Sequence, residues 1–339
     1  MKDMLSVKDC VLVAMTLMLV PILLIELFGV AMVRKNMEAF QNDAPGMPRF
    51  TELLIGGAVS LLLIGVRLTA VKALLPLGRA VLSPQKRVVE DRVLRFATVL
   101  FKFIYFVCIT LVGFKVMHDE PWFPAALGGK GEILKSVDTF SQPPSSALKY
   151  YFLVQLGYHL HSLLFTVFLS PIRSDFIEML LHHVATIILI AGSFLTNYMA
   201  YGAVVVFTHD VGDVTGYGIK SVVDTGNTPL LLFMYAMLLI SWAYTRLFVL
   251  PYHLIYPATL FLRQNDSDHV IIYALPMIVT LCFLVVLHIY WYSLFLVMGY
   301  TLLKKGVAED IQQKVGGPSD VTKGEGARAN SPCKKSKND

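Results

Sequence analysis

The chain has 339 residues, of which 55% are apolar and 16% are charged, with a formal net charge of +5. Its mean hydropathy is +0.62, and the apolar residues come in long blocks rather than at amphipathic spacing. This composition is typical of a polytopic membrane protein. The small charge is spread over loop ends and the tail, so the sequence excludes a nucleic-acid partner.

The long apolar blocks predict about eight membrane-spanning helices, because a helix needs about 20 apolar residues to cross roughly 30 Å of hydrocarbon. The blocks that satisfy this length are 11–33, 53–77, 98–117, 148–169, 175–199, 200–224, 229–254 and 273–302. None shows the ten-residue alternation of barrel strands, so we expect an all-α polytopic fold. The first block is too long for a secretion signal and is predicted to stay as an anchor.

The lysine and arginine distribution predicts the orientation in the membrane. The loop 83–97 is rich in these residues, whereas 118–147 and 256–272 carry few for their length. By the positive-inside rule, both termini are expected on the cytosolic side. The polar tail 306–339 is predicted to be disordered, and its K-x-K-x-x ending is typical of proteins returned to the endoplasmic reticulum. Asn265 is a glycosylation acceptor in a predicted luminal loop.

Two predicted spans, 175–199 and 200–224, each carry one polar seam. At about 100° per residue, their ionisable side chains fall within a narrow arc. A charged side chain at the centre of a membrane helix costs roughly 2.5–3.5 kcal/mol, and such groups usually mark a site. The short connection makes the two helices antiparallel, so the seams reach similar depth. Together they form a His/Asp cluster of His182, His183, His209, Asp210 and Asp213.

Three interpretations of this cluster are possible. Imidazole moves protons near neutral pH and aspartate orients it, so acid–base or acyl-transfer chemistry on a hydrophobic substrate is favoured. One zinc ion held by His182, His209 and Asp213 is an alternative. A hydrogen-bond network that only joins two helices is the third reading. His159 and His161, two apart on one span, cannot both face the site, so at least one is expected to be structural.

Four cysteines are scattered without paired or metal-type spacing, so neither a disulfide framework nor a zinc site built on cysteine is predicted. They are Cys10, Cys108, Cys282 and Cys333. No cysteine lies near the His/Asp cluster and no serine sits in a nucleophile elbow, which argues against a thiol or serine acyl-enzyme.

Five separated segments carry a family likeness. They are "EPWF" (120–123), "KYYFLVQLGYHLHSL" (149–163), "RSDFIEMLLHHVATIILI" (173–190), "NYMAYGAVVVFTHDVGD" (197–213) and "YTRLFVLPYHLI" (244–255). In this order they resemble the Lag1 motif and the rest of the TLC domain of ceramide synthases. The likeness covers roughly residues 90–303. It implies an endoplasmic reticulum enzyme that transfers a fatty acyl group from acyl-CoA to the amine of a sphingoid base. The family's catalytic histidines and aspartates map onto the His/Asp cluster.

The resemblance also implies an organisation of the chain. Residues 1–89 would hold two spans, 90–305 a TLC domain of six spans around a lipid-accessible cavity, and 306–339 the tail. In the resembling family the last luminal loop, here 256–272, influences acyl-chain length. A homodimer, a heterodimer or an accessory subunit is left open.

A hypothesis for the mechanism follows from the residues of the cluster and from the substrates that the resemblance implies. No cofactor or metal is required, because the thioester is already activated. His182 or His183 would be the base, oriented by Asp210 or Asp213, and His209 would donate to the oxyanion. In an alternative order a paired histidine first takes the acyl group. The residues expected to contact substrate are Arg173, Lys220, Asn197, Tyr217 and Arg246. Arg173 and Lys220 would meet the CoA phosphates, with ordinary anchoring of the cytosolic helix ends as the alternative, and Arg246 would pair with an aspartate or extend to the lumen.

A different class of protein carries the same architecture. Translocon-associated and lipid-regulating TLC proteins bind or chaperone and do not synthesise ceramide. A protein of that class would not need all five members of the His/Asp cluster, and it should tolerate the change His183→Ala.

Overall fold

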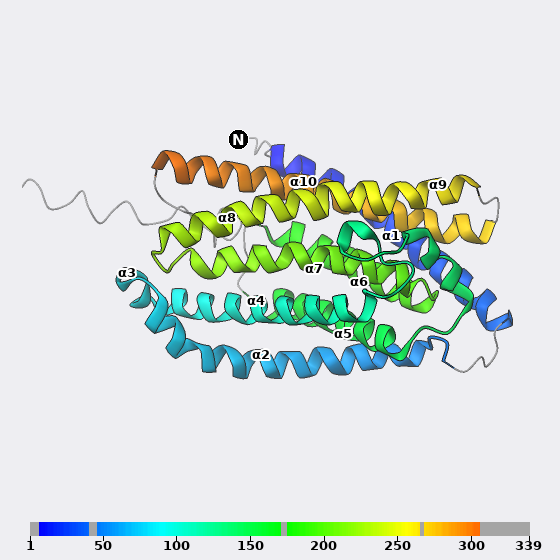
Figure 1. The fold of residues 1–339 in the computed structure, drawn as a ribbon, viewed down its shortest axis with the longest axis horizontal. Helices are drawn as coiled ribbons and strands as arrows, with labels where there is room; N and C mark the ends of the chain where they lie inside the picture. The colour runs from blue at the N-terminus through cyan, green and yellow to red at the C-terminus, as the bar shows by residue number, and fades with distance from the viewer. Residues whose placement is uncertain (1–6, 41–45, 171–174, 265–267, 306–339) are drawn as a thin grey trace, which may run out of the picture.

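The computed structural model describes residues 7–40, 46–170, 175–264 and 268–305, and within these ranges the elements are helical. Figure 1 shows the long helices lying side by side along the length of the molecule. They are α1 (Val7–Phe40), α2 (Leu53–Val81), α4 (Glu90–Met117), α5 (Ser146–Leu164), α6 (Phe176–Leu195), α7 (Met199–Val222), α8 (Thr228–Trp242) and α10 (Asp268–Lys305).

Shorter helical elements join or extend these helices. They are α3 (Pro84–Arg87), α9 (Tyr256–Gln264), the 3-10 turns η1 (Phe50–Glu52), η2 (Ala125–Leu127), η3 (Ile133–Ser136) and η4 (Asp138–Ser141), and the π-helical stretches η5 (Phe165–Leu169) and η6 (Ala243–Ile255). The predictions for Arg173, Asn265 and the tail 306–339 fall outside the described residues.

Six stretches of the described chain are long and apolar enough to cross a membrane: Phe50–Val81, Glu90–Met117, Ser146–Leu169, Phe176–Leu195, Thr228–Gln264 and Ala274–Leu302. The predicted all-α polytopic class is therefore confirmed. The helices α1 and α7 occupy the other two predicted spans but are not among the six, so the count of eight is not confirmed. In α7 the cluster residues lower the hydropathy, because two aspartates and a histidine replace apolar side chains.

Helices run past the predicted spans into segments that were predicted as loops. Helix α4 begins at Glu90, inside the predicted loop 83–97, and α9 makes much of the predicted loop 256–272 helical. An apolar run marks only the part of a helix inside hydrocarbon, whereas its backbone hydrogen bonds continue outside it. The stretch η6 links α8 to α9 in π geometry around Pro251, which cannot donate a backbone hydrogen bond.

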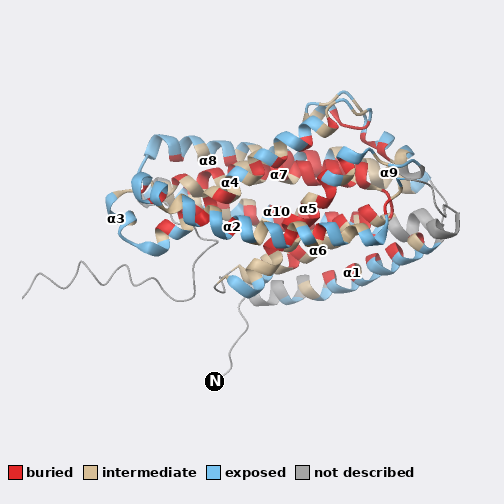
Figure 2. Ribbon diagram, turned by 90° about the horizontal axis from the view of Figure 1, so that it is seen from below, coloured by how far each residue is buried: buried red, intermediate tan, exposed pale blue. Residues whose placement is uncertain are grey.

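Helix α7 runs through the middle of the bundle and packs against α4, α5, α6, α8 and η6. Its side chains are mostly buried, whereas α1 and α2 lie at the periphery with many exposed apolar side chains (Figure 2). This distribution suits a bundle whose outer surface faces lipid and whose polar groups are enclosed.

The turn between α6 and α7 sets the register of the two seam helices. Asn197 adopts a φ of 59°, and its side-chain Nδ2 donates to the carbonyl of Gln142 at 2.7 Å. A left-handed residue followed at once by a new helix reverses the chain within a few residues. Helices α6 and α7 are therefore antiparallel neighbours, as their short connection predicts.

Candidate functional site

The paired histidines project from α6 near the middle of the bundle. His183 is 6% exposed, and its Nε2 lies 3.5 Å from Ser162 Oγ on α5. The His182 ring meets the edge of Trp291 on α10, with 5.4 Å between ring centroids. The Nδ1 atoms of both histidines are buried without a hydrogen-bond partner among the described residues. Burying a ring nitrogen without a hydrogen bond costs free energy, and a bound ligand that supplied the missing hydrogen bond would offset this cost.

His209 on α7 has its tautomer fixed by the backbone. Its Nδ1 lies 2.7 Å from the carbonyl oxygen of Val205, one helical turn earlier, and a carbonyl can only accept. The proton of neutral His209 is therefore on Nδ1, which leaves Nε2 as a lone-pair acceptor. That Nε2 is buried and has no partner in the described part of the chain.

Asp210 is held by α5. It is 1% exposed, and its Oδ2 accepts hydrogen bonds from Gln155 Nε2 and, at 3.4 Å, from the Tyr151 hydroxyl. The Asp210 carboxylate, which was expected to orient a histidine, therefore accepts hydrogen bonds from Gln155 and Tyr151 instead. In the described residues Asp210 makes no hydrogen bond to a histidine ring, so it joins α7 to α5.

Asp213 pairs with Arg246, which projects from the π-helical η6. Arg246 Nη2 lies 2.6 Å from Asp213 Oδ1 and donates to the His209 carbonyl at 3.0 Å. The guanidinium also lies 3.9 Å from the ring centroid of Trp242. The structure thus selects the aspartate pairing for Arg246 over an extended position. A buried ion pair of this kind needs several partners to offset its desolvation, and Arg246 has them.

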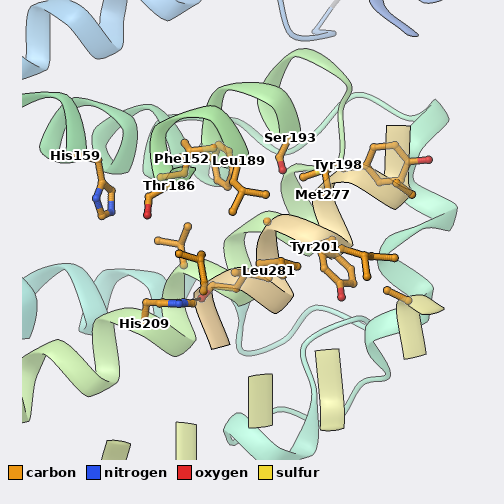
Figure 3. Close-up of a pocket in the computed structure, with 18 of the residues that line it drawn as sticks. Phe152, His159, Thr186, Leu189, Ser193, Tyr198, Tyr201, His209, Met277 and Leu281 are labelled. Carbon is orange, nitrogen blue, oxygen red and sulfur yellow. Dashed lines mark hydrogen bonds between the residues drawn. The ribbon is translucent and has the colours of Figure 1, made fainter. Parts of the chain in front are cut away.

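Two cavities meet at the cluster. The apolar cavity runs beside α6 and α7 toward their turn; Figure 3 shows His159 and His209 at one end of it and Tyr198 and Tyr201 at the other. The basic cavity lies on the other side of the cluster, away from that turn. It is lined by four cationic side chains: Arg67, Lys102, Lys220 and Arg246. The side chains that line both cavities are His159, His182 and Asp213.

The other predicted substrate residues divide between the two ends of the bundle. Tyr217 and Lys220 line the basic cavity, where Tyr217 stacks on Phe106 with ring centroids 5.3 Å apart. Asn197 lies at the α6–α7 turn and lines neither cavity. Its side-chain amide donates to the Gln142 carbonyl at the turn, so Asn197 does not lie in the His/Asp cluster.

Two further histidines belong to the site. His159 lines both cavities, whereas its neighbour His161 lines neither, which resolves which of the two faces the cluster. His288 on α10 is fully buried, with its ring 4.9 Å from that of His209 and 5.7 Å from that of Trp242. Sequence reasoning overlooked His288. The sequence shows His288 as a single histidine in an otherwise apolar span, and such a histidine is usually interpreted as part of helix packing.

The metal alternative gains no support from the geometry. Within the described residues, no group of three or more histidine, cysteine, aspartate or glutamate side chains has an arrangement that could hold a metal ion. Asp213, one of the three ligands considered, is instead directed at Arg246.

The middle of the chain matches a protein-family model. Residues 95–297 match the TLC domain of the TRAM, LAG1 and CLN8 proteins, a match that covers more than half of the chain. The chain belongs to the TLC-domain family. The TLC domain therefore includes α5, α6, α7, η6 and most of α10, which carry every member of the His/Asp cluster together with His159, Arg246 and His288.

Relatives of this TLC protein are named ceramide synthases. It is 29% identical to ceramide synthase 4 of Mus musculus over 66% of the chain and 55% of that protein. It is 27% identical to ceramide synthase LOH1 of Arabidopsis thaliana over 65% of the chain and 71% of that protein. Ceramide synthase hyl-1 of Caenorhabditis elegans is 28% identical over 69% of the chain and 62% of its own length. The matched region thus spans about half of the mouse relative.

Proposed function

We propose that this TLC-domain protein is a ceramide synthase, which transfers a fatty acyl group from acyl-CoA to the amine of a sphingoid base. The observation that carries the proposal is the meeting of an apolar and a basic cavity at His159, His182 and Asp213. Acyl-CoA has the same two-part character, with a hydrocarbon chain on one side of its thioester and an anionic nucleotide on the other. The names of the relatives support the same activity.

Acyl-CoA fits the two cavities in one orientation. Its acyl chain would lie in the apolar cavity and its phosphates near the cations of the basic cavity, with Lys220 close to the end of α7 and Arg67 and Lys102 beside it. The thioester would then lie beside His182. In the orientation expected from the positive-inside rule, the mouth of the basic cavity is cytosolic, where acyl-CoA is supplied.

The chemistry requires a proton acceptor for the amine. We assign it to His209, because its Nε2 carries a lone pair fixed by the bond from Nδ1 to Val205. The amine nitrogen attacks the thioester carbon, the C–N bond forms, the C–S bond breaks, and CoA leaves as a thiolate. His159, whose Nδ1 has no partner among the described residues, is a candidate donor to the oxyanion. This assignment differs from the sequence-based one, in which His209 was the donor.

A route through an acyl-histidine is the alternative order of events. His182 faces both cavities and could take the acyl group before passing it to the amine. Steady-state kinetics distinguish the two orders. Intersecting double-reciprocal lines would reject the acyl-histidine route, and parallel lines would reject direct transfer.

The proposal includes a location and a membrane orientation. The protein would reside in the endoplasmic reticulum membrane with both termini in the cytosol, and membrane lipid would surround the exposed apolar faces of α1 and α2. A homodimer, a heterodimer or an accessory subunit is compatible with this arrangement. No metal or cofactor takes part in the proposed steps.

The test is mass spectrometry of membranes that contain the protein, supplied with a sphingoid base and a panel of acyl-CoAs. We expect N-acylated base from the wild type, and a loss of at least 100-fold in His209→Ala, which removes the proposed base, and in His182→Ala, whose side chain would lie beside the thioester. His118→Ala is the matched control, because His118 lies outside both cavities and pairs with Asp119. Absence of product from folded wild type would instead favour a lipid-binding or translocon-associated TLC protein.

A further inference from the structure

The far end of the apolar cavity is lined in part by a segment outside the helices α5, α6, α7 and α10. Leu134 and Val137, from η3 and the residue after it, line the cavity there together with Ala258 and Phe261 of α9. The turn η3 packs against α9 and α7, and Figure 1 shows the connection between α4 and α5 at the same end of the bundle as α9. The family resemblance directs attention to the loop that holds α9, yet η3, which packs against α9, lines the same end of the cavity.

This segment is anchored in the core by aromatic side chains. Phe123 is fully buried and meets Phe207 of α7 edge-on, with ring centroids 5.4 Å apart. On the other side, the Tyr244 hydroxyl of η6 donates to the carbonyl of Ala126 at 2.8 Å. A β-carbon on Gly131 would collide with the backbone of Pro121, so the chain folds back tightly at this point. The connection is therefore tied to two of the helices that build the site.

Local hydrogen bonds fix η3 itself. Ser136 Oγ donates to the Ile133 carbonyl at 2.6 Å, and the backbone N–H of Val137 donates to the Leu134 carbonyl at 3.1 Å. Ile133 and Ser136 are buried. Since both ends of the turn are held, Leu134 and Val137 present a fixed apolar surface to the cavity.

The cavity sets a distance between the reacting group and this surface. From His182 to Leu195, α6 rises about 20 Å at roughly 1.5 Å per residue. An acyl chain whose thioester lies at His182 would run along this length, and its methyl end would approach the end of the cavity that η3 and α9 line. Each methylene buried in an apolar site is worth about fourfold in affinity, the equivalent of about 0.8 kcal/mol. A methylene that meets a fixed wall loses that gain.

We propose that Leu134 and Val137 limit the length of the acyl chain that this protein transfers, forming with α9 the wall at the far end of the cavity. This inference rests on the proposed acyltransferase function. It assigns a specificity-determining role to the connection between α4 and α5.

The first test is a competition among acyl-CoAs of increasing chain length, with the product distribution read by mass spectrometry. Leu134→Ala and Val137→Ala should raise the longer products relative to the preferred one by about fourfold or more, since space opens at the methyl end. Leu134→Trp should lower the longest products by at least tenfold. Lys135→Ala is the matched control, because Lys135 belongs to the same turn but lines neither of the two cavities; it should leave the distribution unchanged.

A second measurement does not depend on turnover. Wild type without sphingoid base is irradiated in the presence of an acyl-CoA that carries a diazirine at its methyl end, and the labelled peptide is identified. We expect the label on the peptide that contains residues 133–137, and a reduced yield in Leu134→Trp.

The outcomes separate the two proposals. Active variants with the wild-type product distribution would overturn the inference and leave the proposed function intact. A wild type that forms no N-acylated base would overturn the proposed function, and the photolabel would then decide the inference alone. Label confined to other helices would contradict it in either case.

Discussion

Arg246 connects three features of the site, since it pairs with Asp213, donates to the backbone of His209 and stacks on Trp242. Removing one member of a buried ion pair leaves the other charge uncompensated, at a cost of about 3–5 kcal/mol. We predict that Asp213→Asn lowers the thermal stability of the detergent-solubilised protein markedly. The double variant Asp213→Asn with Arg246→Gln should recover much of that stability, because no buried charge is left alone, but not the activity.

The comparison of these variants identifies what the pair does. A destabilisation in the double variant equal to the sum of those in Asp213→Asn and Arg246→Gln alone would contradict an ion pair that is energetically coupled. Full activity in the double variant would show that Asp213 is needed only to neutralise Arg246.

His288 is the second residue with a testable role. Its ring is fully buried against His209 and Trp242, and both ring nitrogens are without a hydrogen-bond partner in the described structure. Such a ring holds its neighbour by contact. We predict that His288→Ala lowers kcat about tenfold with little change in the KM for acyl-CoA, because the vacated space lets the His209 ring rotate.

The variant His288→Phe distinguishes packing from proton transfer. A ring of similar shape restores the contact, so we expect most of kcat to return. If His288→Phe is as impaired as His288→Ala, then an imidazole nitrogen of His288 takes part directly.

At the residue scale, sequence identified groups that are expensive to bury but not their partners. The seam of His182, His183, His209, Asp210 and Asp213 followed from helical periodicity in two adjacent spans. The partners of the two aspartates, Gln155 with Tyr151 and Arg246, lie on helices distant in the chain. No periodicity within one helix encodes such a pairing, which is why the expected histidine–aspartate bonds were wrong.

At the scale of elements, the α6–α7 turn depends on one residue. Asn197 has a φ of 59°, a conformation that alanine adopts at a cost of about 1–2 kcal/mol. We predict that Asn197→Ala destabilises the protein by about that amount plus the lost bond to Gln142, whereas Asn197→Gly loses only the bond. Thermal unfolding of the two variants measures the difference.

The same variants test whether Asn197 contacts substrate, as its sequence position suggested. In our account, the activity per folded molecule stays near wild type in Asn197→Gly. A specific rise in the KM for either substrate in that variant would restore the sequence-based assignment.

The helices themselves were largely predictable, and their irregular stretches were not. Apolar runs located each long helix within several residues, since hydrocarbon thickness fixes their length. The π-helical geometry of η6, which presents Arg246, and the continuation into α9 depend on how backbone bonds shift around Pro251. The turn η3 was hidden in a connection without apolar periodicity, because its position is set by the burial of Phe123 in another part of the bundle.

At the scale of the whole molecule, charge is distributed unequally between the two cavities. The basic cavity gathers Arg67, Lys102 and Lys220, and the apolar cavity has no lysine or arginine among its lining residues. Arg67 comes from α2, outside the matched TLC domain, so the N-terminal region contributes to the site.

A kinetic consequence follows for the anionic substrate. We predict that Lys220→Gln raises the KM for acyl-CoA about fivefold, the effect of roughly 1 kcal/mol, and leaves kcat nearly unchanged. Added salt should raise the same KM less in the variant than in the wild type. Lys115→Gln is the matched control, since Lys115 is exposed in the last turn of α4 and does not line the basic cavity. An unchanged KM in Lys220→Gln would place the CoA phosphates elsewhere.

The most direct test of the central claim is a stoichiometry measured on purified protein in lipid nanodiscs. Acyl-CoA and a sphingoid base are supplied with a chelator and without ATP, and the free CoA thiol and the N-acylated base are quantified together. Our account predicts equal amounts of both, release of the thiol only in slow background when the base is omitted, and loss of both in His182→Ala. Folded protein that binds the base but releases no CoA, or that needs an added metal ion, would contradict it.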